Sequence, residues 1–271
     1  MGRLDEAAFE EALAADPDAA LELLSQMAAA SDRQLRLLAR RLAARVAVRL
    51  TRSGAARAGG VGRLQRVRLE PGGDLDVDAS LDALVVAIAS GRPVDVEALR
   101  GSAWRRPRLA LCLVVDRSGS VSGARLASSV LAAAAVALRA PDDYSVVVFS
   151  DRAVVIKSQD VARPTDAVVD DLLALRGHGV TDLAAALDTA RAQLARSTAT
   201  RRMTVLLSDC RPTAGPDPAS YGRRLEGLTV VAPADDAADA VAFAAATGAR
   251  YVTLAGPAAV PQALSFLSES G

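Results

Sequence analysis

Strand-length and helix-length segments alternate from Leu109 to Ser268, and this alternation constrains the fold more than any other feature of the sequence. Leu109–Val115 is an unbroken apolar run, which is typical of a central strand buried on both faces. A helical pattern at Ser122–Arg139 follows it, and the same succession recurs toward the end of the chain. The pattern predicts an α/β fold in which helices cover both faces of a mostly parallel sheet.

The remaining elements of this region are expected to follow the same pattern. Strands at Tyr144–Ser150 and Ala153–Lys157 flank Asp151-Arg152, a tight hairpin turn that makes one edge strand antiparallel. Further strands are expected at residues 203–208, 228–232 and 250–254, and helices at residues 164–175, 183–195, 218–225, 236–246 and 257–268.

The residues before Leu109 are expected to form two further parts. Residues 1–62 predict a smaller, mainly helical N-terminal region, with helices at about 4–29 and 31–52 and a flexible connection at 53–62. Residues 63–108 predict a connecting module with a strand at 63–69, a turn at 71–73, a helix at 79–89 and a basic segment at 104–108. Residues 109–271 are then the main domain.

The formal net charge is zero, but the charges are unevenly distributed along the chain. Residues 1–32 hold eight acids against Arg3 alone, whereas residues 33–69 hold eleven arginines and no acid. The acidic and basic helices can pack together, or the segment Arg33–Arg68 can form a docking surface for an acidic protein or nucleic acid. No aromatic residue interleaves with these arginines, so nucleic-acid binding is not expected.

The sequence predicts a cytoplasmic protein with no membrane partner. Its first residues are acidic and lack the continuous apolar segment of a secretory signal. The longest apolar run, Leu126–Leu138, is shorter than the ~20 residues that a membrane-spanning helix needs. Cys112 and Cys210 are the only cysteines, lack CxxC spacing and are expected in the core.

Oxygen-bearing side chains follow the ends of two predicted strands. Asp116, Ser118 and Ser120 occupy alternate positions directly after the first strand, and Asp209 follows the strand at 203–208. Thr181 lies at the start of a predicted helix, where Thr181 or Asp182 can also act as an ordinary helix cap. In open α/β sheets ligands bind outside the carboxyl ends of the strands, so these side chains are expected to face one position.

An all-oxygen set of two carboxylates and three hydroxyls suits a hard cation such as Mg²⁺ or Mn²⁺. Zinc is disfavoured, because the chain has a single histidine, His178, and no paired cysteines. Neutral hydroxyl ligands leave the cation electron-poor and with room in its shell. An open position of this kind suits a carboxylate supplied by a partner protein.

The order Asp116-Arg-Ser118-Gly-Ser120, then Thr181 and Asp209, resembles the metal-ion-dependent adhesion site of von Willebrand factor A (VWA) domains. The resemblance implies a doubly wound fold with six strands in the order 3-2-1-4-5-6. It also implies direct metal binding by the hydroxyls of the three motif residues, with the two aspartates acting mainly through water and the partner supplying a Glu or Asp. The form RRPRLALCLVVDRSGSVSG is similar to intracellular bacterial members of the MoxR-associated or CoxE-like type, which implies a MoxR-type AAA+ ATPase as partner.

Two alternatives to a non-enzymatic adaptor remain at this point. A chelatase D-subunit-like component of a metal-insertion complex shares the motif, although neither its ATPase-like module nor its acidic linker is visible. A hydrolase using the Asp116/Ser118 loop lacks a second aspartate two residues after the first and the GxSxG pattern of a serine nucleophile. The chain also lacks a Walker A pattern, so nucleotide hydrolysis of its own is not expected.

Overall fold

The computed structural model of the 271-residue chain describes residues 5–28, 38–43, 45–47, 49–50, 63–69, 74–105, 109–117, 123–174 and 179–268. The chain divides into two compact units. The first combines Met1–Ala58 with Leu109–Glu269, and the second is essentially Gly59–Arg108.

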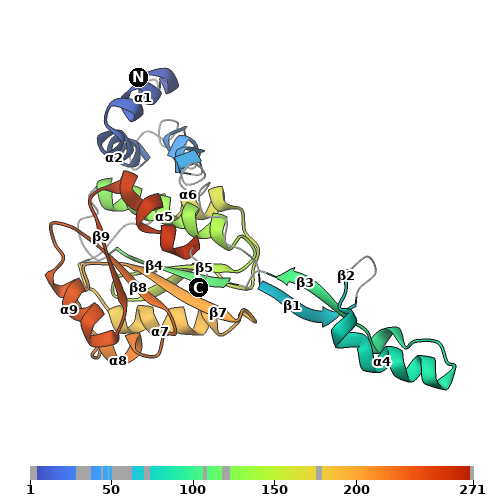
Figure 1. Ribbon diagram of the computed structural model, residues 1–271. Coiled ribbons are helices and arrows are strands. Elements are labelled where there is room, and N and C mark those ends of the chain that lie inside the picture. Colours follow the sequence, from blue (N-terminus) through green and yellow to red (C-terminus); the bar gives the residue numbers. More distant parts are fainter. Residues whose placement is uncertain are drawn as a thin grey trace. The chain divides into compact units, whose positions relative to one another are not determined.

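The first unit is built on a six-stranded sheet (Figure 1). Its strands are β4 (Leu109–Asp116), β5 (Tyr144–Phe149), β6 (Ala153–Lys157), β7 (Arg201–Leu207), β8 (Leu228–Pro233) and β9 (Arg250–Leu254). Their order is β6-β5-β4-β7-β8-β9, in which β6 pairs antiparallel with β5 and every other pair is parallel. Counted from β4 this is 3-2-1-4-5-6, so the predicted doubly wound α/β fold is confirmed.

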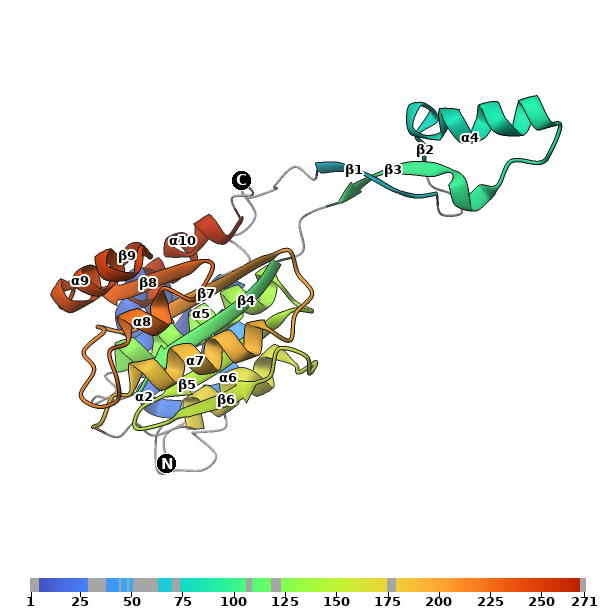
Figure 2. The same ribbon diagram turned by 90° about the horizontal axis from the view of Figure 1, so that it is seen from below.

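Helices cover both faces of this sheet (Figure 2). Helices α5 (Gly123–Arg139) and α6 (Thr165–Ala174) lie on one face, and α7 (Leu183–Leu194), α8 (Ala219–Gly222) and α9 (Ala238–Thr247) lie on the other. Alternate residues of β4 therefore enter different cores: Leu111 and Leu113 pack toward α5, whereas Ala110 and Cys112 pack toward α7. The unbroken apolar run of β4 exists because both faces of this strand are buried.

The last predicted helix, at 257–268, is in fact three short pieces. They are η2 (Pro257–Ala259), α10 (Val260–Ala263) and η3 (Ser265–Ser268). Pro257 and Pro261 each lie in the first turn of a new piece, because proline lacks the N–H that a continuous helix requires. The predicted helix at 218–225 is also shorter than expected, since only Ala219–Gly222 is α-helical.

The N-terminal helices share a hydrophobic core with the sheet, which differs from the expected separate region at 1–62. Helices α1 (Glu6–Ala15) and α2 (Pro17–Ala28) contribute Phe9, Leu13 and Leu24 to the core that contains α5. The sequence showed that these helices have an apolar face, but periodicity does not say which surface covers it. Residues 38–43, 45–47 and 49–50 are helical and add Leu42 and Val46 to the same core.

Polar contacts also fix α2 to the sheet domain. The Ser25 hydroxyl donates to the carbonyl of Gly123 at 2.7 Å, and the Asp18 carboxylate accepts from the Ala258 N–H at 2.7 Å. A Cβ at Gly123 would lie 2.6 Å from Cγ of Glu22, so the close approach of α2 to the start of α5 requires glycine. One acidic–basic pair of the kind expected from the charge pattern is present, because Arg49 makes a two-pronged ion pair with Glu10.

The second unit contains a three-stranded antiparallel sheet in the order β1-β3-β2 and a helix. Its elements are β1 (Arg63–Arg68), β2 (Asp74–Leu75), α4 (Val77–Ser90), η1 (Val96–Ala98) and β3 (Arg100–Arg105). The expected strand at 63–69 and helix at 79–89 are present, but the interpretation of 104–108 as a basic segment misses β3. The sequence of β3 does not alternate apolar and polar residues, so no strand was expected there. Its pairing with β1 identifies it in the structure. The expected connection at 53–62 and turn at 71–73 lie outside the described residues.

Candidate functional site

The carboxyl ends of β4 and β7 bring two predicted site residues to one edge of the sheet. The strands are parallel neighbours, with Val115 opposite Leu207, so both chains leave the sheet at the same level. Asp116 is the last residue of β4 and Asp209 is the second residue after β7. Between them, the Ser208 hydroxyl donates a hydrogen bond of 2.6 Å to the Asp116 carboxylate. The predicted convergence of Asp116 and Asp209 follows directly from this strand order.

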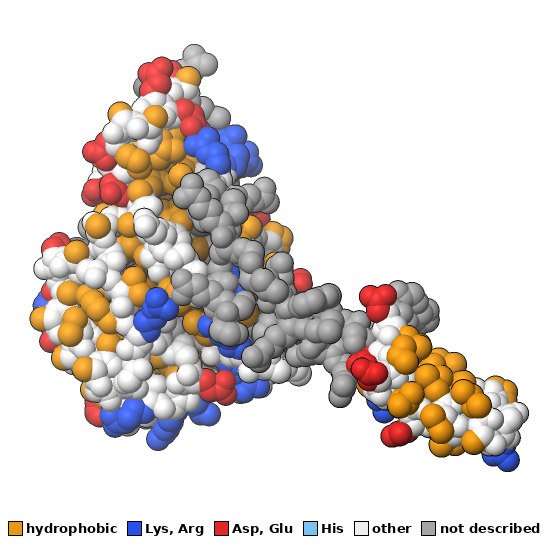
Figure 3. Space-filling model, in the orientation of Figure 1, with side chains coloured by type: hydrophobic (Ala, Val, Ile, Leu, Met, Phe, Trp, Pro, Cys, Tyr) orange, Lys and Arg blue, Asp and Glu red, His pale blue; other side chains and the backbone are white. Residues whose placement is uncertain are grey.

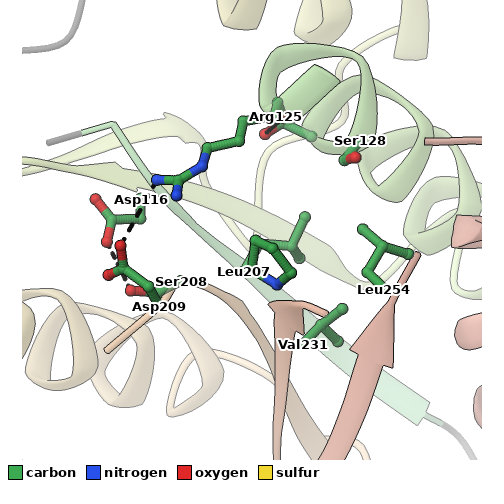
Figure 4. Close-up of a pocket in the computed structure, with 10 residues that line it drawn as sticks. Asp116, Arg125, Ser128, Leu207, Ser208, Asp209, Val231 and Leu254 are labelled. Atoms are coloured by element: carbon green, nitrogen blue, oxygen red, sulfur yellow. Dashed lines mark hydrogen bonds and ion pairs between the residues drawn. The ribbon is translucent and has the colours of Figure 1, made fainter. Parts of the chain in front are cut away.

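Asp116 and Asp209 line a small pocket with a volume of about 60 Å³. In Figure 4 their carboxylates and the Arg125 guanidinium lie together on one side of the site, while Val231 and Leu254 lie on the other side. The pocket therefore has a charged side and an apolar side. A volume of this size accommodates a hydrated ion or a few waters, not a large organic ligand.

Arg125 places a positive charge beside these carboxylates. Its guanidinium lies 3.6 Å from the Asp209 carboxylate and 3.9 Å from that of Asp236. It belongs to the first turn of α5, where the helix dipole disfavours a cation. Arg125 is not part of the predicted ligand set. Its unfavourable position in the first turn of a helix is the one signal for it in the sequence, since it indicates that acids outside the helix hold the side chain.

Thr181 is held at the same edge of the sheet by backbone contacts. It is buried, its N–H donates to the Thr213 hydroxyl at 2.8 Å, and its carbonyl accepts from the N–H groups of Thr213 and Ala214. The next residue, Asp182, caps α7 through the Ala185 N–H, and its own N–H donates to the Ser150 carbonyl after β5. Asp182 fills the capping role, so Thr181 is not needed for it.

Two of the five predicted ligands, Ser118 and Ser120, lie outside the described residues, as does His178. The residue directly after Asp116 lies within the described residues. Arg117 is buried, with its N–H bonded to the Phe149 carbonyl and its guanidinium bonded to the Leu172 carbonyl, both at 2.8 Å. Burial lowers the pKa of this guanidinium. These contacts fix the chain direction directly after Asp116, a role that the sequence analysis did not assign to Arg117.

Cys210 has a left-handed backbone conformation, with φ of 59°, directly after Asp209. Its N–H donates to the Ser208 hydroxyl at 2.9 Å, so the turn positions the serine that contacts Asp116. Burial and then the Asp209 charge raise the pKa of the Cys210 thiol above its usual range, and burial raises that of Cys112 to about 12. Both thiols stay protonated at neutral pH, which argues against a cysteine nucleophile.

The donor chemistry at this edge fits a hard cation better than a soft one. Among the residues that the structure describes, no three His, Cys, Asp or Glu side chains form a metal-binding group. The carboxylates of Asp116 and Asp209 and the buried Thr181 provide oxygens alone, as Mg²⁺ and Mn²⁺ prefer. The approach of Arg125 to Asp209 shows that this edge attracts positive charge.

Comparison with known protein families identifies the chain. The model of the family described as "VWA domain containing CoxE-like protein" matches residues 38–259. The chain belongs to this family. VWA domains are generally protein-interaction modules without catalytic activity. No curated protein matches the sequence significantly.

Several solved structures are similar to the CoxE-like VWA protein at low sequence identity. A von Willebrand factor type A structure from Catenulispora acidiphila has a TM-score of 0.48 at 14% identity, covering 62% of this chain and 43% of that one. The PilB minor pilin from Streptococcus sanguinis (D319A mutant) has a TM-score of 0.47 at 15% identity, covering 63% and 64%. Proximal thread matrix protein 1 from the mussel byssus has a TM-score of 0.45 at 11% identity, covering 59% and 45%. The chain thus spans less than two thirds of each of these proteins.

No helix within the described ranges combines the length and the apolar character that crossing a membrane requires.

Proposed function

We propose that the CoxE-like VWA protein is a non-enzymatic adaptor that binds a partner's carboxylate through a Mg²⁺ or Mn²⁺ ion. The observation that carries this proposal is the pair of carboxylates at the ends of two adjacent parallel strands. Asp116 and Asp209 line one pocket, and a cationic side chain from α5 already lies beside Asp209. The two carboxylates lower the free energy of holding a cation between them.

The proposed ligands are Asp116, Ser118, Ser120, Thr181 and Asp209. A bound Mg²⁺ or Mn²⁺ supplies an electrophilic centre for a carboxylate from another protein. The chain's own residues hold the site in place: Ser208 orients Asp116 through its hydroxyl, and the loop after β7 holds the Thr181 backbone. Arg117, directly before Ser118 in the sequence, is held by its hydrogen bond to the Leu172 carbonyl.

Two enzymatic or assembly alternatives are less well supported. A hydrolase using the Asp116/Ser118 loop lacks the second aspartate two residues after Asp116 and the GxSxG pattern of a serine nucleophile, and no histidine lines the pocket among the described residues. A chelatase D-subunit-like role would use the same adaptor chemistry within a metal-insertion complex. The described part of the chain shows no feature that favours this chelatase role over a general adaptor.

The partner in this proposal is a MoxR-type AAA+ ATPase that acts with the adaptor in assembling or remodelling a client, in the cytoplasm. The family membership supports an adaptor, and the ATPase supplies the nucleotide hydrolysis for which this chain has no Walker A pattern. We expect a purified MoxR-type ATPase to retain the adaptor in a pull-down with Mg²⁺. We expect this retention to be lost with EDTA and with the Ser118→Ala/Ser120→Ala variant. Retention unaffected by both treatments would remove the metal from the interaction.

Arg125 is expected to compete with the metal for the Asp209 carboxylate. The Arg125→Ala variant should therefore bind Mn²⁺ about two- to fivefold more tightly than wild type, the scale of a partly exposed ion pair. Isothermal titration calorimetry measures this difference. Arg191→Ala is the matched control, because Arg191 has similar exposure and pairs with Asp188 on the helix α7 surface. Unchanged or weaker affinity in Arg125→Ala would show that Arg125 does not compete with the ion.

A further inference from the structure

Helix α4 of the second unit carries a continuous apolar face that this unit does not cover. Of the fourteen exposed large hydrophobic side chains in the described part of the chain, seven lie between residues 75 and 96. Four of them, Val77, Leu81, Val85 and Ile88, recur at helical spacing and form one side of α4, here called the α4 stripe. Ile88 is 80% exposed and Leu81 is 53% exposed. Figure 3 shows hydrophobic side chains gathered along this helix.

The stripe residues of α4 are exposed, whereas Leu84, which lies between Ser80 and Ala87, is half-buried. The buried residues of the helix are the small Ser80 and Ala87. The Ser80 hydroxyl bonds both the N–H and the carbonyl of Arg100 on β3, at 2.9 and 3.2 Å. A helix that only needed to cover its own sheet would turn its leucines and valines toward that sheet. Most leucine and valine side chains of α4 are instead exposed, so the described residues of the second unit leave the stripe uncovered.

Both ends of α4 are capped, so the stripe is a defined surface. The Asp76 carboxylate accepts from the Ala79 N–H at 3.0 Å, and Gly91 ends the helix in the left-handed conformation with φ of 61°. Gly91 is one of the few positions where only glycine adopts the required backbone without strain.

Helix α4 itself is acidic, because it contains Asp78 and Asp82 and no basic residue. Residues 74–97 contain six acids and a single basic residue, Arg92. Asp78 and Asp82 each follow a stripe residue by one position, so both lie along the same flank of the apolar face. A surface of this composition is complementary to a partner that is apolar on one side and positively charged at its edges.

We propose that the α4 stripe binds an amphipathic helix of a partner protein whose apolar face is flanked by lysine or arginine. A second copy of this chain fits less well, because antiparallel pairing of two α4 helices about a two-fold axis brings the Asp82 carboxylates together. An anionic membrane surface also fits less well, because its negative charge would be repelled by the acidic flank of α4. The proposed contact uses no metal ligand, so it is distinct from the carboxylate interaction at β4 and β7.

Fluorescence anisotropy with two designed peptides tests this proposal. Both peptides have leucines at positions i, i+4, i+7 and i+11 of an alanine-rich helix, flanked in one by lysines and in the other by glutamates. We expect the full-length protein to bind the lysine peptide about tenfold more tightly than the glutamate peptide, with no effect of EDTA. Leu81→Ser/Ile88→Ser should weaken this binding about tenfold or more. Asp78→Lys/Asp82→Lys should reverse the preference between the peptides.

The control variant is Val241→Ser, which replaces an exposed apolar side chain of α9 and should leave peptide binding unchanged. Equal binding of both peptides, or no loss in Leu81→Ser/Ile88→Ser, would overturn the proposal. A wild-type dimer in light scattering that dissociates in Ile88→Ser would assign the stripe to a second copy. Binding to phosphatidylglycerol vesicles that is lost in the same variant would assign it to a membrane. A slow thiol reaction of Ile88→Cys would show that the chain itself covers the stripe.

Discussion

Replacing Asp116 with alanine is expected to abolish measurable binding of Mg²⁺ and Mn²⁺ while the protein remains folded. Asp116 and Asp209 are the two carboxylates that line the pocket, so removing one of them halves its negative charge. Loss of a carboxylate that acts through water or through a neighbouring ligand typically weakens metal binding about 10- to 100-fold. Calorimetric titration of Mn²⁺ into wild type and variant measures the effect.

The variant Asp116→Asn separates loss of charge from loss of structure. An asparagine oxygen can still accept the hydrogen bond from the Ser208 hydroxyl, so we expect this variant to keep the wild-type melting temperature and to lose metal binding. Asp151→Ala is the matched control, since Asp151 is an exposed carboxylate just after β5 that does not line the pocket. Equal metal affinity in wild type and Asp116→Ala would place the ion elsewhere.

Replacing Leu24 with alanine is expected to destabilise the sheet of the first unit by about 2–5 kcal/mol. Leu24 belongs to α2 but is 1% exposed and lies in the core that includes β4 and α5. A cavity at this position removes contacts on both sides of the helix–sheet interface. Leu23→Ala is the control, because Leu23 precedes it in the same helix and is 52% exposed.

Urea denaturation combined with hydrogen exchange of β4 amides measures this coupling. If α2 unfolds cooperatively with the sheet, Leu24→Ala shows a single urea transition with a lower midpoint. Hydrogen exchange of the β4 amides is then also faster than in wild type. A separate early transition of the N-terminal helices, with β4 exchange at the wild-type rate, would show that residues 1–62 are an independent region.

The sheet domain was largely predictable because its sequence signals agree with its packing. The β4 run is apolar throughout because alternate residues enter two cores, and the hairpin Asp151-Arg152 lies where β6 turns back on β5. The resemblance to VWA domains added the strand order, which periodicity alone does not give. Strand β3 was missed because its sequence, RGSAWR, does not alternate apolar and polar residues. Only its pairing with β1 in the structure identifies it as a strand.

The candidate site was predictable in its carboxylates but not in its supporting contacts. Asp116 and Asp209 follow apolar strands and could be read from sequence order. Arg125 and Ser208 belong to the site only because α5 and β7 place them beside those carboxylates. Contacts of this kind arise from tertiary packing and leave no spacing pattern in the chain, so the structure was needed to find them.

Diffraction from crystals grown with Mn²⁺ tests the central claim most directly, because the anomalous signal locates the ion itself. The account predicts one anomalous peak at the carboxyl ends of β4 and β7, bounded by Asp116, Thr181 and Asp209, and its absence in crystals of Asp116→Ala. A peak bound by other residues, or no peak at this edge of the sheet at saturating Mn²⁺, would contradict it.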